Sequence, residues 1–387
     1  MYDSVFGHIR SASIGLWLRP LLPFVSVLRP PHFPPNRYNL TISFVSSLSV
    51  GYEERESLHL VERLTASRQY VDSGEPREHL DLGEYPVDSD VNGKNDRGQT
   101  GLHVAVLNGD VSKVVSLLKS GASASKTDAL GLTPLHYCAC HSHRDEKMIK
   151  LLVESGAALN ERDQNSRTPF ALFCVNPSPS VFKYLLSRNP SLLVKDNENW
   201  TPLHFACAGG IGVGMLESLV QNRAPLAVDK RGRTPLHLAC SRGHEEIVKY
   251  LVQTAGAQVN VKDVAGWTPL SMSVANSHVH IASWLIEVAK ADILVANVRG
   301  WTILHVAASL GNSGMVRLAL QQNVPVNAVD VSGRSALHYT MAQDFDDISN
   351  LLIRHGADAD LKDARGWTPA QLKRKTWAQS LWSCQLM

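Results

Sequence analysis

The sequence has little of several features on which common functions depend. Six cysteines in 387 residues are too few for a disulfide scaffold and are more typical of a reducing compartment, the cytosol or the nucleus. With 38 Lys and Arg against 36 Asp and Glu, the net charge of +2 gives no strong footprint for nucleic acid or an anionic membrane. The apolar run over residues 14–28 is broken by Arg19, Pro20 and Pro23, so it falls short of the roughly 20 residues of a membrane span.

Sequence signatures of catalysis are also missing. No Gly-x-x-x-x-Gly-Lys-Ser/Thr, no Gly-x-Ser-x-Gly and no set of kinase motifs occurs. His244-Glu-Glu246 lacks the second histidine of a zinc-protease helix. The run Gly209-Gly-Ile-Gly-Val-Gly214 lacks the spacing of a dinucleotide fingerprint, and we interpret it as a flexible turn. The sequence therefore predicts no catalytic group and no cofactor, and we expect a protein that is not an enzyme.

The first 87 residues differ in composition from the rest of the chain. Residues 1–50 are rich in arginine, serine and proline and contain one acid, which fits a disordered tail, an imprecise gene start or an organellar transit peptide. Of these, a targeting role is the less favoured. Residues 51–87 are acidic and hold one amphipathic segment, residues 57–70. We expect a linker or a degenerate capping helix there, leading into one domain over residues 88–387.

From residue 96 onward the sequence repeats itself. The threonine or serine of a recurring Thr-Pro-Leu-His element marks each unit, and the markers are Thr100, Thr133, Thr168, Thr201, Thr234, Thr268, Thr302, Ser335 and Thr368. Successive markers are 33, 35, 33, 33, 34, 34, 33 and 33 residues apart. Such a period is the signature of a stacked repeat architecture rather than of separate globular domains.

A 33-residue period carrying Thr-Pro-Leu-His resembles the ankyrin repeat. The resemblance covers about residues 88–375, and the clearest unit begins Asp229-Lys-Arg-Gly-Arg-Thr-Pro-Leu-His237. It implies an all-α, right-handed solenoid of nine units, each a short β-hairpin turn followed by two antiparallel helices. The ninth unit, starting at Asp363, is incomplete, and we interpret it as a terminal cap.

The recurring residues have separate structural roles. The marker threonine is expected to cap the first helix, and the following proline fits its first turn. A glycine two residues before the marker is expected to take a positive φ at Gly98, Gly131, Gly232, Gly266, Gly300, Gly333 and Gly366. The resemblance assigns the histidine three residues after the marker a hydrogen-bonding role that ties hairpins together. Asparagines eight residues before the marker are expected to stabilise turns, at Asn92, Asn160, Asn260 and Asn327.

One stretch, residues 136–143, resembles a metal site because it contains five thiol or imidazole groups. Zinc needs four convergent donors, and Cys138 and Cys140 diverge on a helix because they lie two residues apart. We therefore expect structural cysteines, an exposed turn at His141 and His143, and no metal. The remaining repeat cysteines, six residues after their markers, are interpreted as buried thiols rather than nucleophiles: Cys174, Cys207 and Cys240.

Aromatic and arginine side chains gather at the position just before the marker. In ankyrin proteins this position lies on the hairpin and is directed toward the concave binding face. Tryptophan and arginine are enriched at binding hot spots. The sequence therefore suggests partner binding through Trp200, Arg233, Trp267, Trp301, Arg334 and Trp367. The alternative is that these side chains pack along neighbouring hairpins, and the two interpretations are close to even, with binding slightly favoured.

The expected function is that of a monomeric, non-catalytic scaffold or adaptor that binds a protein partner on its concave surface. Nucleic acid and membrane are not expected as partners. Two alternatives stay open. The chain could be the regulatory portion of a larger enzyme, or a protein tethered to a membrane through residues 14–28.

Overall fold

The computed structural model describes residues 90–140 and 145–373. The predicted tail, the acidic segment, His141, His143 and the end of the ninth unit lie outside these residues. Within them all regular secondary structure is helical, apart from one β-bridge that joins Lys94 and Thr100. No helix in this part of the chain is long and apolar enough to cross a bilayer. The all-α fold expected from the repeat pattern is confirmed.

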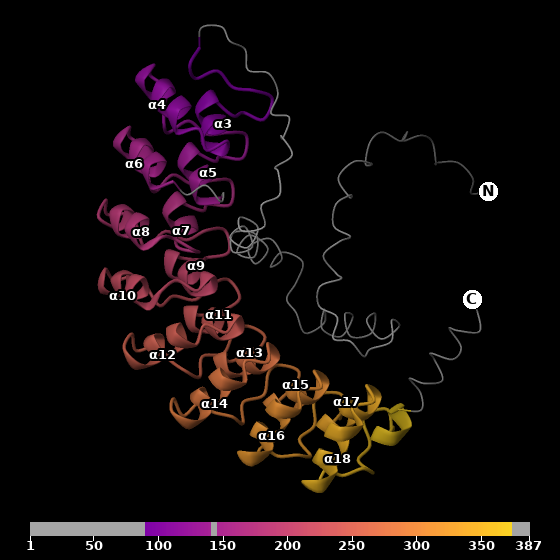
Figure 1. Cartoon of the computed structure of the whole chain (residues 1–387). Helices are drawn as coiled ribbons and strands as arrows, with labels where there is room; N and C mark the ends of the chain where they lie inside the picture. Colours follow the sequence, from indigo (N-terminus) through magenta and orange to yellow (C-terminus); the bar gives the residue numbers. More distant parts are fainter. Residues whose placement is uncertain (1–89, 141–144, 374–387) are drawn as a thin grey trace, which may run out of the picture. The chain divides into compact units, whose positions relative to one another are not determined.

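The helices follow one another in pairs, and we refer to them as first and second helices of each unit (Figure 1). The first helices are α3 (Gly101–Leu107), α5 (Pro134–Cys140), α7 (Pro169–Phe173), α9 (Pro202–Gly209), α11 (Pro235–Arg242), α13 (Pro269–Ala275), α15 (Ile303–Ser309) and α17 (Ala336–Ala342). The second helices are α4 (Val111–Lys119), α6 (Glu146–Glu154), α8 (Pro179–Leu186), α10 (Val213–Gln221), α12 (Glu245–Gln253), α14 (Val279–Glu287), α16 (Ser313–Gln321) and α18 (Asp346–Arg354).

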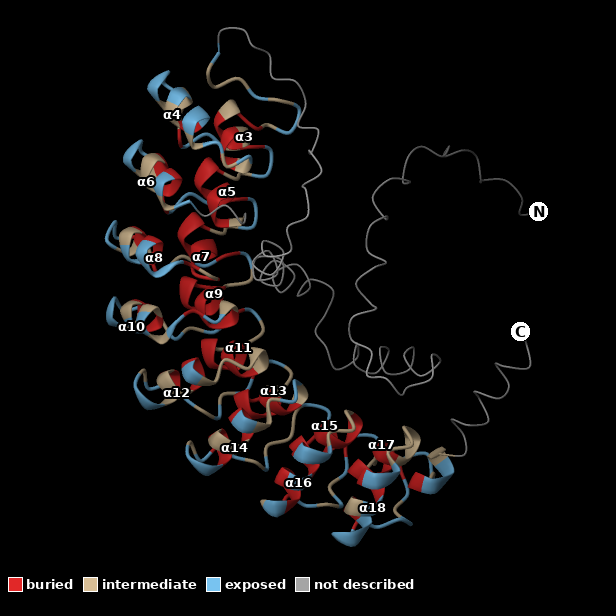
Figure 2. Cartoon of the chain, viewed as in Figure 1, coloured by how far each residue is buried: buried red, intermediate tan, exposed pale blue. Residues whose placement is uncertain are grey.

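The units pack mainly against their neighbours. Most first helices contact the second helix of their own unit and the first helices on either side, and most adjacent second helices contact one another. Figure 2 shows the first helices buried over most of their length and the second helices buried mainly on the side facing the first. One pair cannot bury its apolar stripe alone, so the stack shares one continuous core.

Local sequence explains where the helices begin. In α11 the marker Thr234 has extended backbone angles, and its hydroxyl accepts the N–H of His237. Pro235 occupies the first turn, where its missing N–H leaves no bond unmade. In α12 the apolar side is buried through Ile247, Val248 and Leu251. The capping role predicted for the marker residue is confirmed here and in the sibling units that show the same bond.

The turn that precedes each first helix is called a finger below, and it runs from a buried Asp or a half-buried Asn to the residue before the marker. The seven glycines expected to take a positive φ all do so, with values of 70–78°. Two fingers have other residues there, and Ser166 and Asn199 adopt the same left-handed conformation at 60° and 62°. The fingers are therefore alike in backbone even where the glycine is replaced.

The glycine run between α9 and α10 was expected to be a flexible turn, and this interpretation is wrong. Gly209 ends α9, Gly210 is its left-handed cap at φ 77°, and Gly212 caps α10. A Cβ on Gly209 would lie 1.9 Å from the carbonyl oxygen of Val175. The preceding unit causes this approach, because α7 ends after five residues and the chain then passes directly against α9. Gly209 and Gly210 therefore each meet a specific geometric requirement.

Candidate protein-interaction surface

The fingertips form a row joined by backbone hydrogen bonds. We define the fingertip as the two residues that follow the Asp or Asn at the start of a finger. The first of them donates its N–H to the carbonyl of the second in the preceding finger, at 2.8–3.0 Å. This bond recurs from Ala129 to Arg97, Gln164 to Leu130, Asn197 to Asn165, Lys230 to Glu198, Val264 to Arg231, Val298 to Ala265, Val331 to Arg299 and Ala364 to Ser332. The spacing and direction of neighbouring fingertips are thereby fixed.

Buried carboxylates hold each finger in shape. In the finger at Asp263, one carboxylate oxygen accepts the N–H groups of Ala265 and Trp267 at 2.9 and 2.7 Å. Asn297 makes the same two bonds with its amide oxygen. The second carboxylate oxygen binds neither of these backbone N–H groups, and in most of these aspartates it accepts a hydrogen bond from a nearby side chain. Sequence reasoning assigned no role to this position, although an acid or amide recurs there in every unit.

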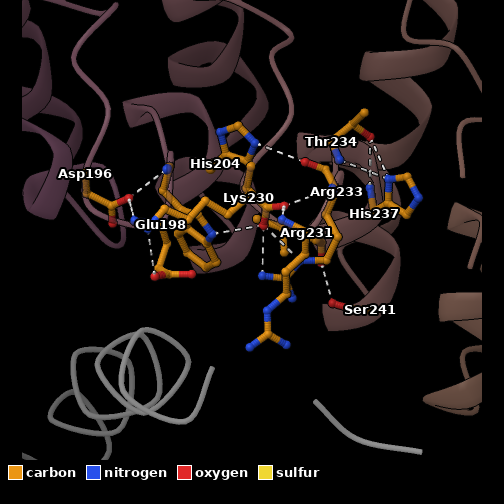
Figure 3. Close-up of polar contacts among 12 residues, drawn as sticks. Asp196, Glu198, His204, Lys230, Arg231, Arg233, Thr234, His237 and Ser241 are labelled. Atoms are coloured by element: carbon orange, nitrogen blue, oxygen red, sulfur yellow. Dashed lines mark hydrogen bonds and ion pairs between the residues drawn. The ribbon is translucent and has the colours of Figure 1, made fainter. Parts of the chain in front are cut away.

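Histidines link six of the units to the next finger, as the resemblance implied. The Nδ1 atom of His204 accepts the N–H of Thr201, so Nε2 carries the proton and donates to the carbonyl of Arg233 at 3.3 Å (Figure 3). The same link recurs at His103, His136, His237, His305 and His338. Burial is the main cause that lowers the pKa of His204 and His237 to about 4, so both stay neutral at physiological pH.

Asparagine side chains make a second link between units. The Asn160 amide oxygen accepts the N–H of Ser191 at 2.9 Å, and Asn92, Asn260 and Asn327 do the same for the following unit. The asparagines were predicted to stabilise their own turns, whereas the bonds seen here reach the next unit, 31 or 32 residues further along the chain. Together with the fingertip bonds, these links make the fingers one preorganised surface.

Trp200 is buried beneath that surface rather than exposed on it. Only 1% of Trp200 is accessible, and its indole N–H donates to Asp229 of the next finger at 3.2 Å. Its ring packs edge-on against Phe205, with centroids 5.1 Å apart. Trp200 thus packs along the neighbouring hairpin, which was the alternative interpretation of the sequence.

Trp301 repeats this arrangement one unit beyond Trp267. It is 6% exposed, its indole N–H donates to Asp330 at 3.2 Å, and its ring lies 4.9 Å from that of Tyr339. The Tyr339 hydroxyl donates to the same carboxylate. Trp301 therefore packs along the neighbouring finger, as Trp200 does.

The two arginines of the predicted site also bind finger carboxylates. Arg233 is buried and forms a paired contact with Asp229, at 2.9 Å from both Nε and a terminal nitrogen. Arg334 is a quarter exposed and contacts Asp363 of the next finger at 3.3 Å. Arg233 is therefore closed off from the surface, whereas Arg334 is partly accessible.

Trp267 and Trp367 are half-buried rather than buried. The finger after Trp267 carries Asn297 where Asp229 and Asp330 accept the indoles of the other two tryptophans. Trp267 therefore lacks the carboxylate that accepts the indole N–H of Trp200 and of Trp301. Whether any of the six residues of the predicted site contacts a partner stays a prediction.

Asp196 is a finger carboxylate without an ion pair within the described residues, unlike Asp163, Asp229 and Asp363. It accepts the N–H groups of Trp200 and Glu198 at 2.7 and 2.9 Å. Burial is the dominant influence and raises the pKa of Asp196 to about 6, whereas the two N–H donors and Arg167 act in the opposite direction. Because this pKa lies above the unfolded value near 3.8, stability is lost as the pH rises through the window from about 4 to 6.

Asp196→Asn is therefore expected to raise the free energy of unfolding by about 1–2 kcal/mol at pH 7.5, with the gain disappearing near pH 4. Asparagine keeps the oxygen that accepts both N–H groups, as Asn297 does. Urea denaturation of both proteins at several pH values measures the difference. The matched control is Asp229→Asn, which removes the carboxylate partner of Arg233 and should destabilise at pH 7.5. An Asp196→Asn gain that did not depend on pH would contradict the assignment.

The cysteines lie where the sequence suggested. Cys174, Cys207 and Cys240 are fully buried, and burial raises the pKa of each thiol, which keeps it protonated and unreactive. Cys138 is also buried and Cys140 is half-buried. No cluster of metal-binding side chains occurs among residues 90–140 and 145–373. His141 and His143 fall outside these ranges, so the expected absence of zinc remains a prediction.

Stacked helix pairs with hydrogen-bonded fingers define a repeat solenoid of the kind used for protein recognition. The sequence matches the family of ankyrin repeats, in blocks of three copies, over residues 75–163, 144–224, 211–297 and 289–363. The chain belongs to the ankyrin-repeat family.

Individual relatives share the repeats but differ in the rest of their length. The B-cell lymphoma 3 protein homolog of Mus musculus is 26% identical over 298 residues, which covers 75% of this chain and 52% of that protein. The tyrosine-protein kinase HTK16 of Hydra vulgaris is 33% identical over 112 residues, covering 28% and 14%, respectively. Inversin of Danio rerio is 32% identical over 88 residues, covering 23% and 8%. The chain thus spans about half or less of the length of each of these relatives.

Proposed function

We propose that this protein is a non-catalytic scaffold or adaptor of a reducing compartment, which binds a protein partner through its fingers and the adjoining first helices. The observation that carries this proposal is the row of backbone hydrogen bonds between fingertips. Because the row fixes exposed side chains before any partner arrives, little conformational entropy is lost on binding. The buried Trp200, Arg233 and Trp301 support the fingers from beneath, and the half-buried Trp267, Arg334 and Trp367 are the members of the predicted site that can contact a partner.

Affinity capture with the full chain tests this function. Tagged protein is incubated with cell extract, and bound proteins are quantified by mass spectrometry for the wild type and for Trp267→Ala and Trp367→Ala. At least one protein recovered with the wild type should fall about tenfold with these variants, as expected when a hot-spot aromatic is truncated.

The matched control is Ile353→Ala, because Ile353 is 41% exposed on the second helix α18, away from the fingers. It should leave recovery unchanged. Partners that respond equally to Ile353→Ala and to the tryptophan variants, or the absence of any partner that depends on the fingers, would contradict the proposal.

A regulatory part of a larger enzyme is the second candidate function. It is favoured by the partial match to the tyrosine-protein kinase of Hydra vulgaris, of which this chain covers 14%. The full-length transcript decides between the two, because a catalytic domain encoded in the same reading frame would establish the second.

A further inference from the structure

Three neighbouring fingertips present exposed valines. Val264 is 70%, Val298 is 67% and Val331 is 73% accessible, although β-branched apolar side chains normally lose contact with water on folding. They are the first fingertip residues of consecutive units. The Val298 N–H binds the finger of Val264, and the Val331 N–H binds that of Val298. The valines therefore form one apolar line with a fixed spacing, which marks an interaction site rather than scattered exposure.

Basic side chains flank this apolar line. The fingertips from the unit of α11 to the end of the described chain are Lys230-Arg231, Val264-Ala265, Val298-Arg299, Val331-Ser332 and Ala364-Arg365. They include four cations and no acid, whereas earlier fingertips include Asp96 and Glu198. The pattern continues two residues before the tips, where Lys262 and Lys362 are exposed, and Val228 and Val329 are nearly half exposed.

Among the described residues, the acids near this surface lie beneath the tips, at the bases of the fingers or on the preceding fingertip. Asp263, Asp330 and Asp363 are buried beneath the tips, where they accept finger N–H groups. Exposed Asp292 and Asp358 lie at the bases of the fingers and bind backbone N–H groups there. Glu198 approaches Lys230 only at 3.8 Å and belongs to the preceding fingertip.

We propose that the fingertips from Lys230 to Arg365 bind an acidic segment of a protein partner in which apolar side chains alternate with carboxylates. This inference rests on the proposed scaffold function and names the chemistry of its partner. The line of valines would contact the apolar side chains, and the flanking cations would contact the carboxylates. Five fingertips spaced about 10 Å apart span roughly 40 Å, the length of about 12 extended residues.

The valines distinguish this partner from a nucleic acid. Phosphate recognition uses Lys, Arg and polar donors, and the centre of a phosphate-binding row would be expected to carry them. Here the first residues of the three middle fingertips, Val264, Val298 and Val331, are all apolar and β-branched, and Arg299 is the one cation among these three tips. An apolar centre with a charged rim is the composition of a protein interface.

Binding of labelled peptides to the full chain tests the proposal. Fluorescence anisotropy compares a peptide of about 12 residues containing glutamate and leucine with two others, one with lysine for glutamate and one with serine for leucine. The glutamate and leucine peptide should bind at least tenfold more tightly than either. Raising the salt from about 0.05 to 0.5 M should weaken it, because the contacts of the cations are screened.

Substitutions test which residues contact the acidic peptide. Val298→Ser and Val331→Ser should each weaken the acidic peptide about tenfold, and Arg299→Ala should reduce the salt dependence. The matched control is Val288→Ser, because Val288 is 53% exposed at the end of α14, and it should have no effect. Circular dichroism melting should be the same for all of them, since the substituted side chains are exposed.

Three results would overturn the proposal. They are equal affinity for the lysine and glutamate peptides, a Val288→Ser variant that weakens binding as much as Val298→Ser, or a duplex DNA that binds more tightly than the acidic peptide and is unaffected by the valine variants. Failure here is separable from failure of the scaffold function. If a captured protein depends on Trp267 or Trp367 while the acidic peptide does not bind, the scaffold function stands and the acidic partner is wrong. If neither is observed, both are wrong.

Discussion

Trp200→Ala is expected to lower the free energy of unfolding by about 3–5 kcal/mol, the range for removing a large buried aromatic side chain. The side chain is 1% exposed, so the substitution leaves a cavity between two fingers. It also removes the indole donor to Asp229 and the edge-on contact with Phe205. Urea denaturation followed by circular dichroism measures the loss, and the transition midpoint should fall without loss of helical signal in the native state.

Two further substitutions separate packing from hydrogen bonding. Trp200→Phe keeps most of the apolar area but has no N–H for Asp229, so its cost should be smaller than that of alanine. Trp267→Ala is the matched control at the same position of a neighbouring unit. Because that ring is half-buried and the following finger carries Asn297, we expect a loss below about 2 kcal/mol. Equal losses for Trp200→Ala and Trp267→Ala would show that burial and the carboxylate acceptor do not set the difference.

Gly209→Ala is expected to cost about 3 kcal/mol, although alanine is normally the better helix former. The added Cβ would lie 1.9 Å from the Val175 carbonyl oxygen, a backbone atom that cannot rotate away. The chain leaving α7 and the end of α9 would therefore have to separate. Thermal melting and urea denaturation should both record the loss.

Gly214→Ala provides the opposite expectation within the same glycine run. Gly214 lies in α10, and a Cβ there would meet nothing within 4 Å. Alanine should stabilise the protein by roughly 0.5–1 kcal/mol, because glycine loses more backbone entropy in a helix. A gain at both positions would mean that no close approach exists at Gly209.

The sequence was sufficient to predict the helices because their start signals are local. A marker such as Thr234, followed by proline, specifies a cap and a first turn without any distant partner. The link made by His237 was also predictable, because the ankyrin resemblance assigned it. The bond from Asn160 to the next unit was not, because the sequence suggested only a role in its own turn.

The exposure of the tryptophans was not predictable from their own position, since it depends on the next finger. Trp200 and Trp301 are each followed 29 residues later by an aspartate that accepts the indole. The unit containing Trp267 is one residue longer and presents Asn297 instead. That difference is present in the sequence. It predicts the exposure of the tryptophan only once it is known that the side chain on one finger reaches the carboxylate of the next finger.

The glycine run was misinterpreted for a similar reason. Its composition is typical of a flexible loop. The requirement at Gly209 comes from Val175, which lies in another unit and reaches α9 only because α7 is short. A contact set by the length of a neighbouring helix cannot be read from the glycines themselves.

The row of fingertip bonds also constrains how the gene can change in length. Each finger donates one N–H to the finger before it and offers one carbonyl to the finger after it, so the bonding edges of the units are interchangeable. Removing residues 264–297 would bring Val298 directly after Asp263, with the Arg231 carbonyl again in reach. Removing one residue from a tip would instead shift the donor out of register. In evolution the array can therefore be lengthened or shortened by whole units through duplication and loss, while single-residue insertions within a tip are selected against.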